Sequence, residues 1–199
     1  RMPGSFGIVD QPAAAPAGEG SWRLEPPPGE GAFATFELPE QMVGVPFLTV
    51  EAPAGTVVEL MTQESHDPTG PAWLDTHRFS WARFVCREGE NRFEAFDYES
   101  LRFLQVHVHD AAGPVLLRDV GVRRRSYPWP RAPSFSCAEP RLQRVFESSF
   151  NTLVNAAQET IVDGMGRERQ QYSGDGAHQL HATRLVCGDR HLARRFLRT

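Results

Sequence analysis

The chain has 199 residues, a formal net charge of −4, 40% hydrophobic residues and 23% charged residues. These proportions are typical of a folded globular protein, and without a basic excess nothing indicates a nucleic-acid partner or an anionic membrane. No apolar run approaches the roughly 20 residues that a membrane-spanning helix needs.

Residues 1–31 are rich in Pro, Gly and Ala and cannot bury enough apolar surface to offset their ordering entropy. They are predicted to be a linker or a loosely attached edge, with Trp22 as its anchor. The first residues do not form a signal peptide, and the sequence is expected to be truncated at both ends. The compartment is therefore undetermined, with the cytoplasm favoured because the three cysteines, Cys86, Cys137 and Cys187, are interpreted as buried thiols.

Residues 32–126 are predicted to form an antiparallel β-sandwich, because short β-rich runs alternate with turn residues. The runs 45–52 and 56–61 flank a short turn that contains Gly55, a pattern that favours a hairpin. In the run 101–109, alternation places Leu104, Val106 and Val108 on one face. His107 and His109 fall on the other face and are expected to point to solvent or to lie at an edge.

Residues 127–134 form a Pro-rich connector, which cannot continue a central strand because proline lacks a backbone N–H. Over residues 135–199, apolar residues recur every three or four positions, the spacing of a helix. A first helix is predicted from Pro140 to about Ile161, a second is capped by Asp175 and stopped by Gly188, and a third is capped by Asp189. Short connections imply antiparallel helical hairpins.

The segment 163–175, between the first two helices, is unusually rich in charged side chains that could take part in catalysis. It contains three carboxylates (Asp163, Glu168 and Asp175), two guanidinium groups and Tyr172. A glycosidase needs one carboxylic acid to protonate the leaving oxygen and a second carboxylate to activate water or to attack the sugar. An ordinary loop with capping Asp residues and surface ion pairs explains the same pattern equally well.

The segment resembles the signature of glycoside hydrolase family 78, the bacterial α-L-rhamnosidases, which reads Asp-Cys-Pro-x-Arg-(Asp)-Glu-Arg-x-Gly-Trp-x-Gly-Asp. The chain keeps Asp163, Arg167-Glu168-Arg169, an aromatic at Tyr172, and Gly174-Asp175. Residues 93–106 and 135–142 resemble the family's last sandwich segment and its entry to the first barrel helix. The resemblance therefore implies an antiparallel β-sandwich followed by the first helices of an (α/α)6 barrel, which is incomplete in this chain.

Carried over residue by residue, the resemblance implies that Glu168 is the general acid. Asp163 and Asp175 would accept hydrogen bonds from sugar hydroxyls, Tyr172 would replace a Trp stacking platform, and Arg167 and Arg169 would support the carboxylates. The sequence departs from the signature where Gly164-Met165 replaces Cys-Pro and Gln171-Tyr172 replaces Gly-Trp.

The implied reaction is inverting hydrolysis of a terminal α-L-rhamnosyl or related residue, with a carbohydrate as partner and no cofactor. About 65 residues follow the connector, whereas twelve helices of ordinary length need well over about 130. The catalytic base is therefore expected outside this chain, which would be inactive alone. No metal is expected, since His178 and His181 lack further ligands at suitable spacing. Oligomeric state is not indicated.

Two alternatives stay open. One is a non-catalytic carbohydrate-binding or scaffold protein with a degenerate glycosidase site, and the other is an (α/α)6 glycosidase that acts on a different sugar. An aromatic and polar cluster, composed of Trp73, Asp75, His77 and Trp81, is consistent with ordinary sandwich packing or with a sugar-contacting loop.

Overall fold

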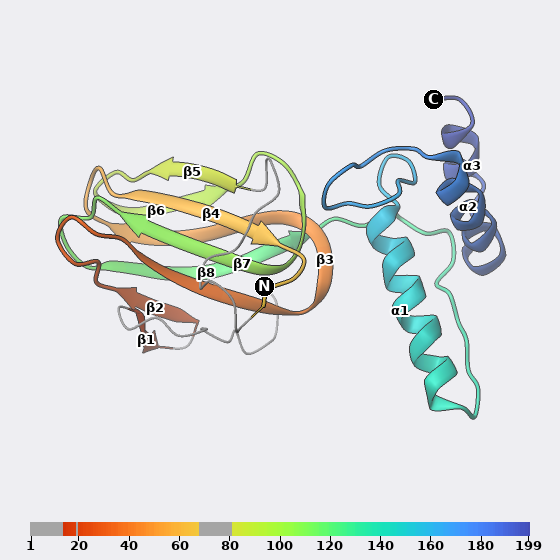
Figure 1. Cartoon of the computed structure of the whole chain (residues 1–199), viewed down its shortest axis with the longest axis horizontal. Helices are drawn as coiled ribbons and strands as arrows, with labels where there is room; N and C mark the ends of the chain where they lie inside the picture. The colour runs from red at the N-terminus through yellow and green to blue at the C-terminus, as the bar shows by residue number, and fades with distance from the viewer. Residues whose placement is uncertain (1–13, 19, 68–80) are drawn as a thin grey trace. The chain divides into compact units, whose positions relative to one another are not determined.

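The computed structural model describes residues 14–18, 20–67 and 81–199, so Trp73, Asp75 and His77 lie outside the described residues. The chain divides into two compact units, Arg1–Arg124 and Arg125–Thr199, which we call the β unit and the helical unit. Figure 1 shows strands in the first and helices in the second. The predicted order, an antiparallel β domain followed by helices, is confirmed.

The described residues of the β unit form eight strands, and all the strand pairs among them are antiparallel. The strands are β1 (Ala14–Gly18), β2 (Ser21–Leu24), β3 (Ala32–Ala52), β4 (Val57–Gln63), β5 (Trp81–Val85), β6 (Gly89–Glu94), β7 (Glu99–His109) and β8 (Val115–Arg124). Their order is β1-β2-β8-β3-β7-β4-β5, and β6 pairs with β3. Strands β1 and β2 fall within the segment expected to be a linker or edge, and the indole of Trp22 is buried there.

The long strand β3 belongs to both layers of the sandwich. Its first half pairs with β7, and its second half pairs with β6 and β8. The register shifts between Glu37 and Met42, where Pro39 lacks the N–H that a regular ladder needs. Figure 1 shows β3 bending at one end of the unit. The sheet thus folds onto itself. Strands β5, β4 and β7 lie in one layer with the first half of β3, and the second half of β3 lies between β8 and β6 in the other layer, with β2 beside β8.

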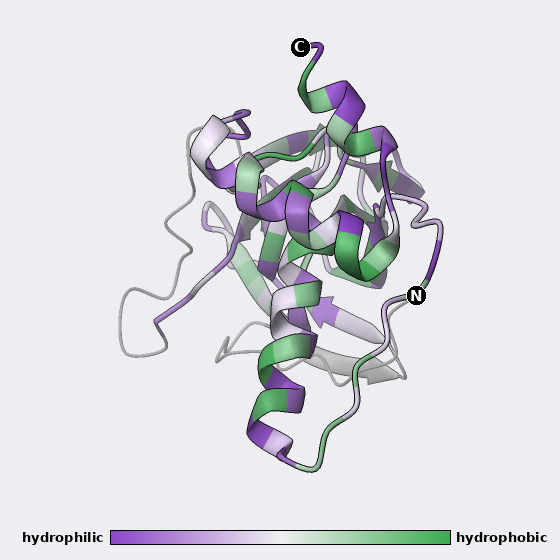
Figure 2. Cartoon of the chain, turned by 90° about the vertical axis from the view of Figure 1, so that its right-hand side faces the viewer, coloured by the Kyte–Doolittle hydropathy of each residue, from purple (hydrophilic) through white to green (hydrophobic). Residues whose placement is uncertain are grey.

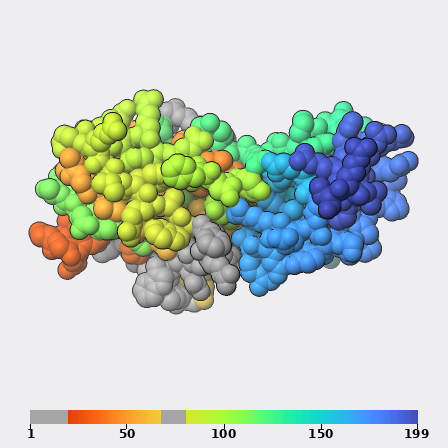
Figure 3. Space-filling view, turned by 90° about the horizontal axis from the view of Figure 1, so that it is seen from above, coloured from red at the N-terminus to blue at the C-terminus, as the bar shows by residue number. Residues whose placement is uncertain are grey.

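Apolar side chains from both layers meet in one core. In β7, Leu104, Val106 and Val108 are completely buried, as the alternation predicts. Aromatic pairs join the layers: Trp22 meets Phe36 edge-on at 4.8 Å, and Phe84 stacks on Phe93 at 4.5 Å between ring centroids. Strands β5 and β6, which carry the second pair, lie at the surface in Figure 3. Burial of one such aliphatic or aromatic side chain stabilises the fold by roughly 1.5–3 kcal/mol.

The hairpin predicted from runs 45–52 and 56–61 is wrong. The turn exists, with Gly55 at φ 87°, but β4 pairs with β5 and β7 rather than with β3. Because the chain crosses between layers at this turn, the apolar faces of β3 and β4 pack in one core. Val50 and Val58 are both completely buried there.

The helical unit contains α1 (Pro140–Ala156), α2 (Ser173–Cys187) and α3 (His191–Phe196). Helix α1 begins as predicted, with Pro140 in its first turn and Glu139 accepting a hydrogen bond from the Arg141 amide at 2.9 Å. It ends one turn earlier than predicted, because Ala157 is extended and pairs with Ile161 instead. Helix α1 carries apolar bands, visible in Figure 2, and its Leu142 and Val145 are exposed.

The second and third helices differ from expectation at their starts. Helix α2 begins at Ser173, so Asp175 lies inside its first turn, where a carboxylate favours the helix dipole without capping it. Gly188 ends α2 in the left-handed conformation, as predicted. The N-cap of α3 is Arg190 rather than the predicted Asp189, but the Asp189 carboxylate still accepts a 2.8 Å hydrogen bond from the Leu192 amide in the first turn.

A small core holds the helical unit together. Ala157, Ile161 and Leu192 are buried, and Tyr127 and Trp129 of the Pro-rich segment pack against them. Cys86 and Cys187 are buried, but Cys137 is exposed, so the expectation of three buried thiols is wrong for Cys137. The three described helices lack the combination of length and hydropathy that a bilayer-crossing helix requires.

Candidate functional site

The loop of residues 163–170 is closed by hydrogen bonds between its two ends. The Asp163 amide donates to the Gln170 carbonyl at 3.0 Å, and the Gln170 amide donates to Oδ1 of Asp163 at 2.8 Å. Inside this closure, the Arg169 amide donates to the carbonyl of Gly164 at 3.0 Å. We call this segment, together with Gln171 and Tyr172, the acidic loop.

Glu168 is the centre of the acidic loop. Its carboxylate forms an ion pair with Arg167, whose side chain is mostly exposed. It also accepts from the Tyr172 hydroxyl, and the carboxyl group of Asp163 lies within hydrogen-bonding reach. Four of the six predicted site residues, Asp163, Arg167, Glu168 and Tyr172, therefore come together.

These contacts shift the protonation of two neighbours. Partial burial acts to raise the pKa of Asp163, but hydrogen bonds from the Gln170 and Gly164 backbone and from Glu168 outweigh it and lower the pKa. The hydrogen bond with Glu168, followed by the negative charge of Glu168, raises the pKa of the Tyr172 hydroxyl. The acidic loop thus favours an ionised Asp163 beside a neutral Tyr172.

The other two predicted residues have different positions. Arg169 adopts the left-handed conformation, with φ 54°, and its Nε donates to the Met165 carbonyl at 2.9 Å. Asp175 lies in the first turn of α2 with an exposed side chain. Among the contacts described for Glu168, none is with Asp175. The roles of Met165 and Gln170, which supply backbone groups to the loop, could not be predicted, because any residue type supplies those groups.

The remaining histidine candidates do not form a site. His178 and His181 are exposed on α2, and among the described residues no three His, Cys, Asp or Glu side chains are grouped to hold a metal. His107 stacks on Phe33 at 5.0 Å and is half-buried, and burial lowers its pKa. It belongs to β7, which has neighbours on both sides, so the expectation of an edge position is wrong, and its half-buried side chain lies on the face opposite Val106 and Val108.

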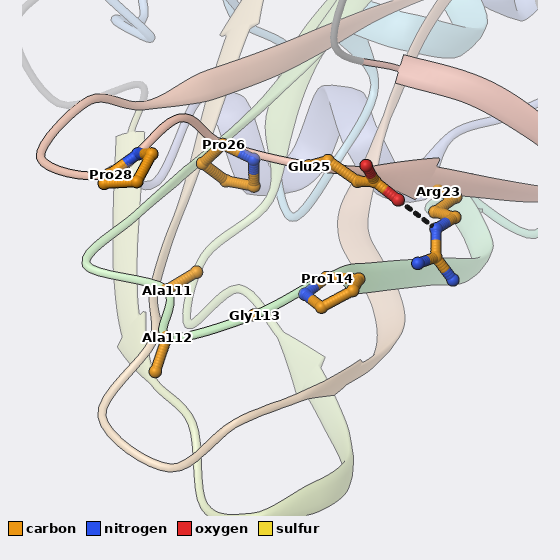
Figure 4. Close-up of a pocket in the computed structure, with 8 residues that line it drawn as sticks. All are labelled: Arg23, Glu25, Pro26, Pro28, Ala111, Ala112, Gly113 and Pro114. Carbon is orange, nitrogen blue, oxygen red and sulfur yellow. Dashed lines mark hydrogen bonds and ion pairs between the residues drawn. The ribbon is translucent and has the colours of Figure 1, made fainter.

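A shallow pocket of about 490 Å³ lies in the described part of the β unit and is shown in Figure 4. It lies where the segment after β2 meets the turn between β7 and β8. An ion pair between Arg23 and Glu25, 2.6 Å long, stands at one side. The rest of the lining is proline, alanine and glycine, namely Pro26, Pro28, Ala111, Ala112, Gly113 and Pro114. Apart from this ion pair, which satisfies both charges, the lining offers no charged group for catalysis.

Comparisons with known proteins show which solved structures share this fold. No family model matches the sequence, and a search of curated proteins finds no similar sequence. The fold is similar to that of a family 78 rhamnosidase of Bacillus sp. GL1, with a TM-score of 0.77 and 23% identity over 88% of this chain. A rhamnosidase from Klebsiella oxytoca with rhamnose bound has a TM-score of 0.72 and 19% identity over 96% of this chain. An α-L-rhamnosidase from Aspergillus terreus has a TM-score of 0.53 and 16% identity over 83% of this chain.

The likeness covers most of this chain but only part of the similar proteins. The chain spans 19% of the Bacillus protein, 42% of the Klebsiella protein and 19% of the Aspergillus protein. At identities below 25%, the likeness concerns the fold. The chain therefore has the fold of one segment of α-L-rhamnosidases, a β-sandwich followed by helices.

Proposed function

We propose that the whole protein is a glycoside hydrolase of the α-L-rhamnosidase type and that Glu168 is its general acid. One observation carries the proposal: in a chain with the fold of a rhamnosidase segment, Glu168 contacts both Asp163 and Tyr172 within one closed loop. A general acid must hold a proton and deliver it to the leaving oxygen. The contacts with Asp163 and Tyr172 hold the Glu168 carboxyl group in one position, from which it can make this transfer.

The other members of the acidic loop are assigned to substrate binding. Asp163, whose lowered pKa favours the ionised form, accepts hydrogen bonds from sugar hydroxyls. The exposed ring of Tyr172 offers a face on which the C–H surface of a sugar can pack. Asp175, exposed in the first turn of α2, is a second acceptor, and Arg167 neutralises charge beside Glu168.

An inverting reaction also needs a base. In inverting glycosidases the two carboxyl groups lie about 6.5–9.5 Å apart, which leaves room for the attacking water. Asp163 lies within hydrogen-bonding reach of Glu168 and is too close for this role. We therefore assign the base to a residue outside these 199 residues and expect this chain alone to be inactive.

The test uses the full-length protein, assayed on p-nitrophenyl α-L-rhamnoside and on a panel of other p-nitrophenyl glycosides. Glu168→Gln should reduce kcat by about 10²–10⁴, the usual contribution of a positioned acid. The loss should be larger on methyl α-L-rhamnoside, because a poor leaving group depends more on protonation. The matched control is Glu147→Gln, which changes an exposed carboxylate on α1 that contacts only the neighbouring Gln143 among its described hydrogen bonds.

Three results would decide between the alternatives. Hydrolysis of another glycoside by the wild type, lost in Glu168→Gln, identifies a different sugar specificity. Sugar binding without hydrolysis supports a non-catalytic binding protein. Equal rates of hydrolysis for the wild type and Glu168→Gln would show that Glu168 is not the general acid.

A further inference from the structure

Arg169, which follows Glu168 in the acidic loop, has an uncommon backbone conformation. Its φ is 54°, in the left-handed region that side chains other than glycine rarely adopt. Such conformations persist only where surrounding contacts hold them, and they gather at functional sites. Arg169 directly follows Glu168 in the sequence, so its conformation determines how the chain turns after the proposed acid.

Two hydrogen bonds from Arg169 hold this turn. Its amide donates to the Gly164 carbonyl at 3.0 Å, and its guanidinium Nε donates to the Met165 carbonyl at 2.9 Å. The Met165 side chain is buried, so the carbonyl belongs to a well-packed part of the loop. Both bonds reach back to residues that directly follow Asp163, and together they tie the second half of the loop to its first half.

We propose that Arg169 is a positioning residue, whose guanidinium bond to the Met165 carbonyl maintains the left-handed turn that keeps Glu168 against Asp163 and Tyr172. That Glu168 acts as the acid rests on the proposed function. The position of its carboxyl group can nevertheless be measured without an assay of hydrolysis. This role differs from direct support of the carboxylates, because it acts through the backbone.

The Tyr172 hydroxyl reports where Glu168 lies, because contact with Glu168 raises the pKa of Tyr172. We would titrate the tyrosines of the 199-residue chain by ¹³C NMR and assign Tyr172 with a Tyr172→Phe variant. In Arg169→Ala the pKa of Tyr172 should fall toward its ordinary value of 10.0. Tyr127, whose pKa is raised to about 12 by burial and then by Asp189, is an internal reference for the fold of the same unit.

The matched control is Arg167→Ala. The charge of Arg167 lowers the pKa of Tyr172, so its removal should raise that pKa. Loss of a nearby positive charge and loss of positioning therefore shift Tyr172 in opposite directions. A rise in both variants would mean that Arg169 acts only through its charge, and no shift in Arg169→Ala would mean that it does not position Glu168; either result overturns the proposal.

Two further variants separate the guanidinium from the backbone. Arg169→Lys keeps a donor that can reach the Met165 carbonyl and should retain the raised pKa of Tyr172. Arg169→Gly accepts the left-handed conformation without strain but has no donor, and it should lose the raised pKa. A raised pKa in the Gly variant would show that conformation alone suffices, against the proposal.

The test still gives an answer if Arg169→Ala disturbs the fold of the helical unit. If Arg169→Ala also lowers the pKa of Tyr127, the Lys variant decides: a raised Tyr172 pKa supports positioning, and an ordinary one overturns it. Because no hydrolysis is measured, a protein that fails every glycoside assay but shows these shifts retains the positioning role while the proposed function is rejected.

Discussion

The Tyr127 hydroxyl donates a 3.0 Å hydrogen bond to Oδ2 of Asp189, which is almost completely buried. The other carboxylate oxygen accepts from the Leu192 amide at 2.8 Å. Tyr127, in the Pro-rich segment, thus provides a hydrogen-bond partner for the buried carboxylate of Asp189 at the start of α3. The same contact connects two parts of the helical unit that are about 60 residues apart in sequence.

Tyr127→Phe should therefore destabilise the helical unit by about 1–3 kcal/mol, because it leaves one oxygen of a buried carboxylate without a partner. Urea unfolding of the 199-residue chain, monitored by helical circular dichroism, measures the difference. Tyr98→Phe in the β unit is the control for loss of a tyrosine hydroxyl. Equal midpoints for Tyr127→Phe and wild type would contradict the assigned role.

The same contact makes stability depend on alkaline pH. Burial, followed by the hydrogen bond and the charge of Asp189, raises the pKa of Tyr127 to about 12. A group whose folded pKa lies above its unfolded value contributes stability that is complete below the unfolded pKa. That contribution should decline as the pH rises from about 10 to about 12. The Phe variant should lack this decline, which unfolding curves at several pH values can show.

Asp163 should stabilise the acidic loop through an acceptor oxygen that an amide can replace. Asp163→Asn keeps an oxygen for the Gln170 amide, whereas Asp163→Ala leaves that amide without it. We expect fast hydrogen exchange at Gln170 in the Ala variant, slow exchange in the Asn variant, and a cost of about 1 kcal/mol for Ala. Similar exchange rates in both variants would mean that the loop closes without Asp163.

The lowered pKa of Asp163 should make the stability of the fold depend on pH in acid, with a sign opposite to that of Tyr127 in alkali. Its folded pKa is lowered from 3.8, so its contribution to stability is present above that value and is lost as the pH falls below it. Wild type should therefore lose stability in acid faster than Asp163→Asn, whose side chain does not titrate. Parallel acid unfolding curves would show that Asp163 has no such effect.

Gly44 lies where β3 changes partners, opposite Glu99 of β7 and Arg124 of β8. A Cβ at Gly44 would lie 2.4 Å from the Arg123 carbonyl oxygen, a backbone atom that cannot move aside easily. Gly44→Ala should destabilise the β unit by roughly 1–3 kcal/mol. Gly113→Ala, whose Cβ would meet only Pro53 at an ordinary 3.6 Å, is the control. Thermal unfolding of both variants tests the difference.

The sequence predicts the strands of the β unit well, because side chains in a strand alternate between core and exterior. In β7, this period alone identifies Leu104, Val106 and Val108 as core residues. It does not predict strand partners. The crossing between β3 and β4 looks like a hairpin in sequence, since a short turn leads equally to a neighbouring strand or to the opposite layer.

The acidic loop shows the same limit on a smaller scale. Its residue types indicate a site, and Asp163, Glu168 and Tyr172 do come together. The conformation that brings them together is not visible in the sequence, because the left-handed residue is Arg169 rather than one of the nearby glycines. Asp175 also starts no helix, because α2 begins two residues earlier.

Helix α3 packs against α2 at Gly176, which faces the ring of Phe196, and this contact provides a matched pair of variants. A Cβ at Gly176 would lie 2.2 Å from Cζ of Phe196, so Gly176→Ala must displace the ring and should cost about 1–3 kcal/mol. At Gly174, in the same turn of α2, a Cβ would meet no atom within 4 Å. Gly174→Ala should stabilise α2 by about 0.5–1 kcal/mol, because alanine loses less backbone entropy in a helix.

Urea unfolding monitored by circular dichroism measures both variants, and their opposite signs make the pair informative. The double variant Gly176→Ala with Phe196→Leu tests the cause, because a smaller side chain makes room for the new methyl group. If the clash is responsible, Gly176→Ala should cost less in the Phe196→Leu background than in the wild type. An unchanged cost would place the effect in α2 itself and remove the α2–α3 contact as its source.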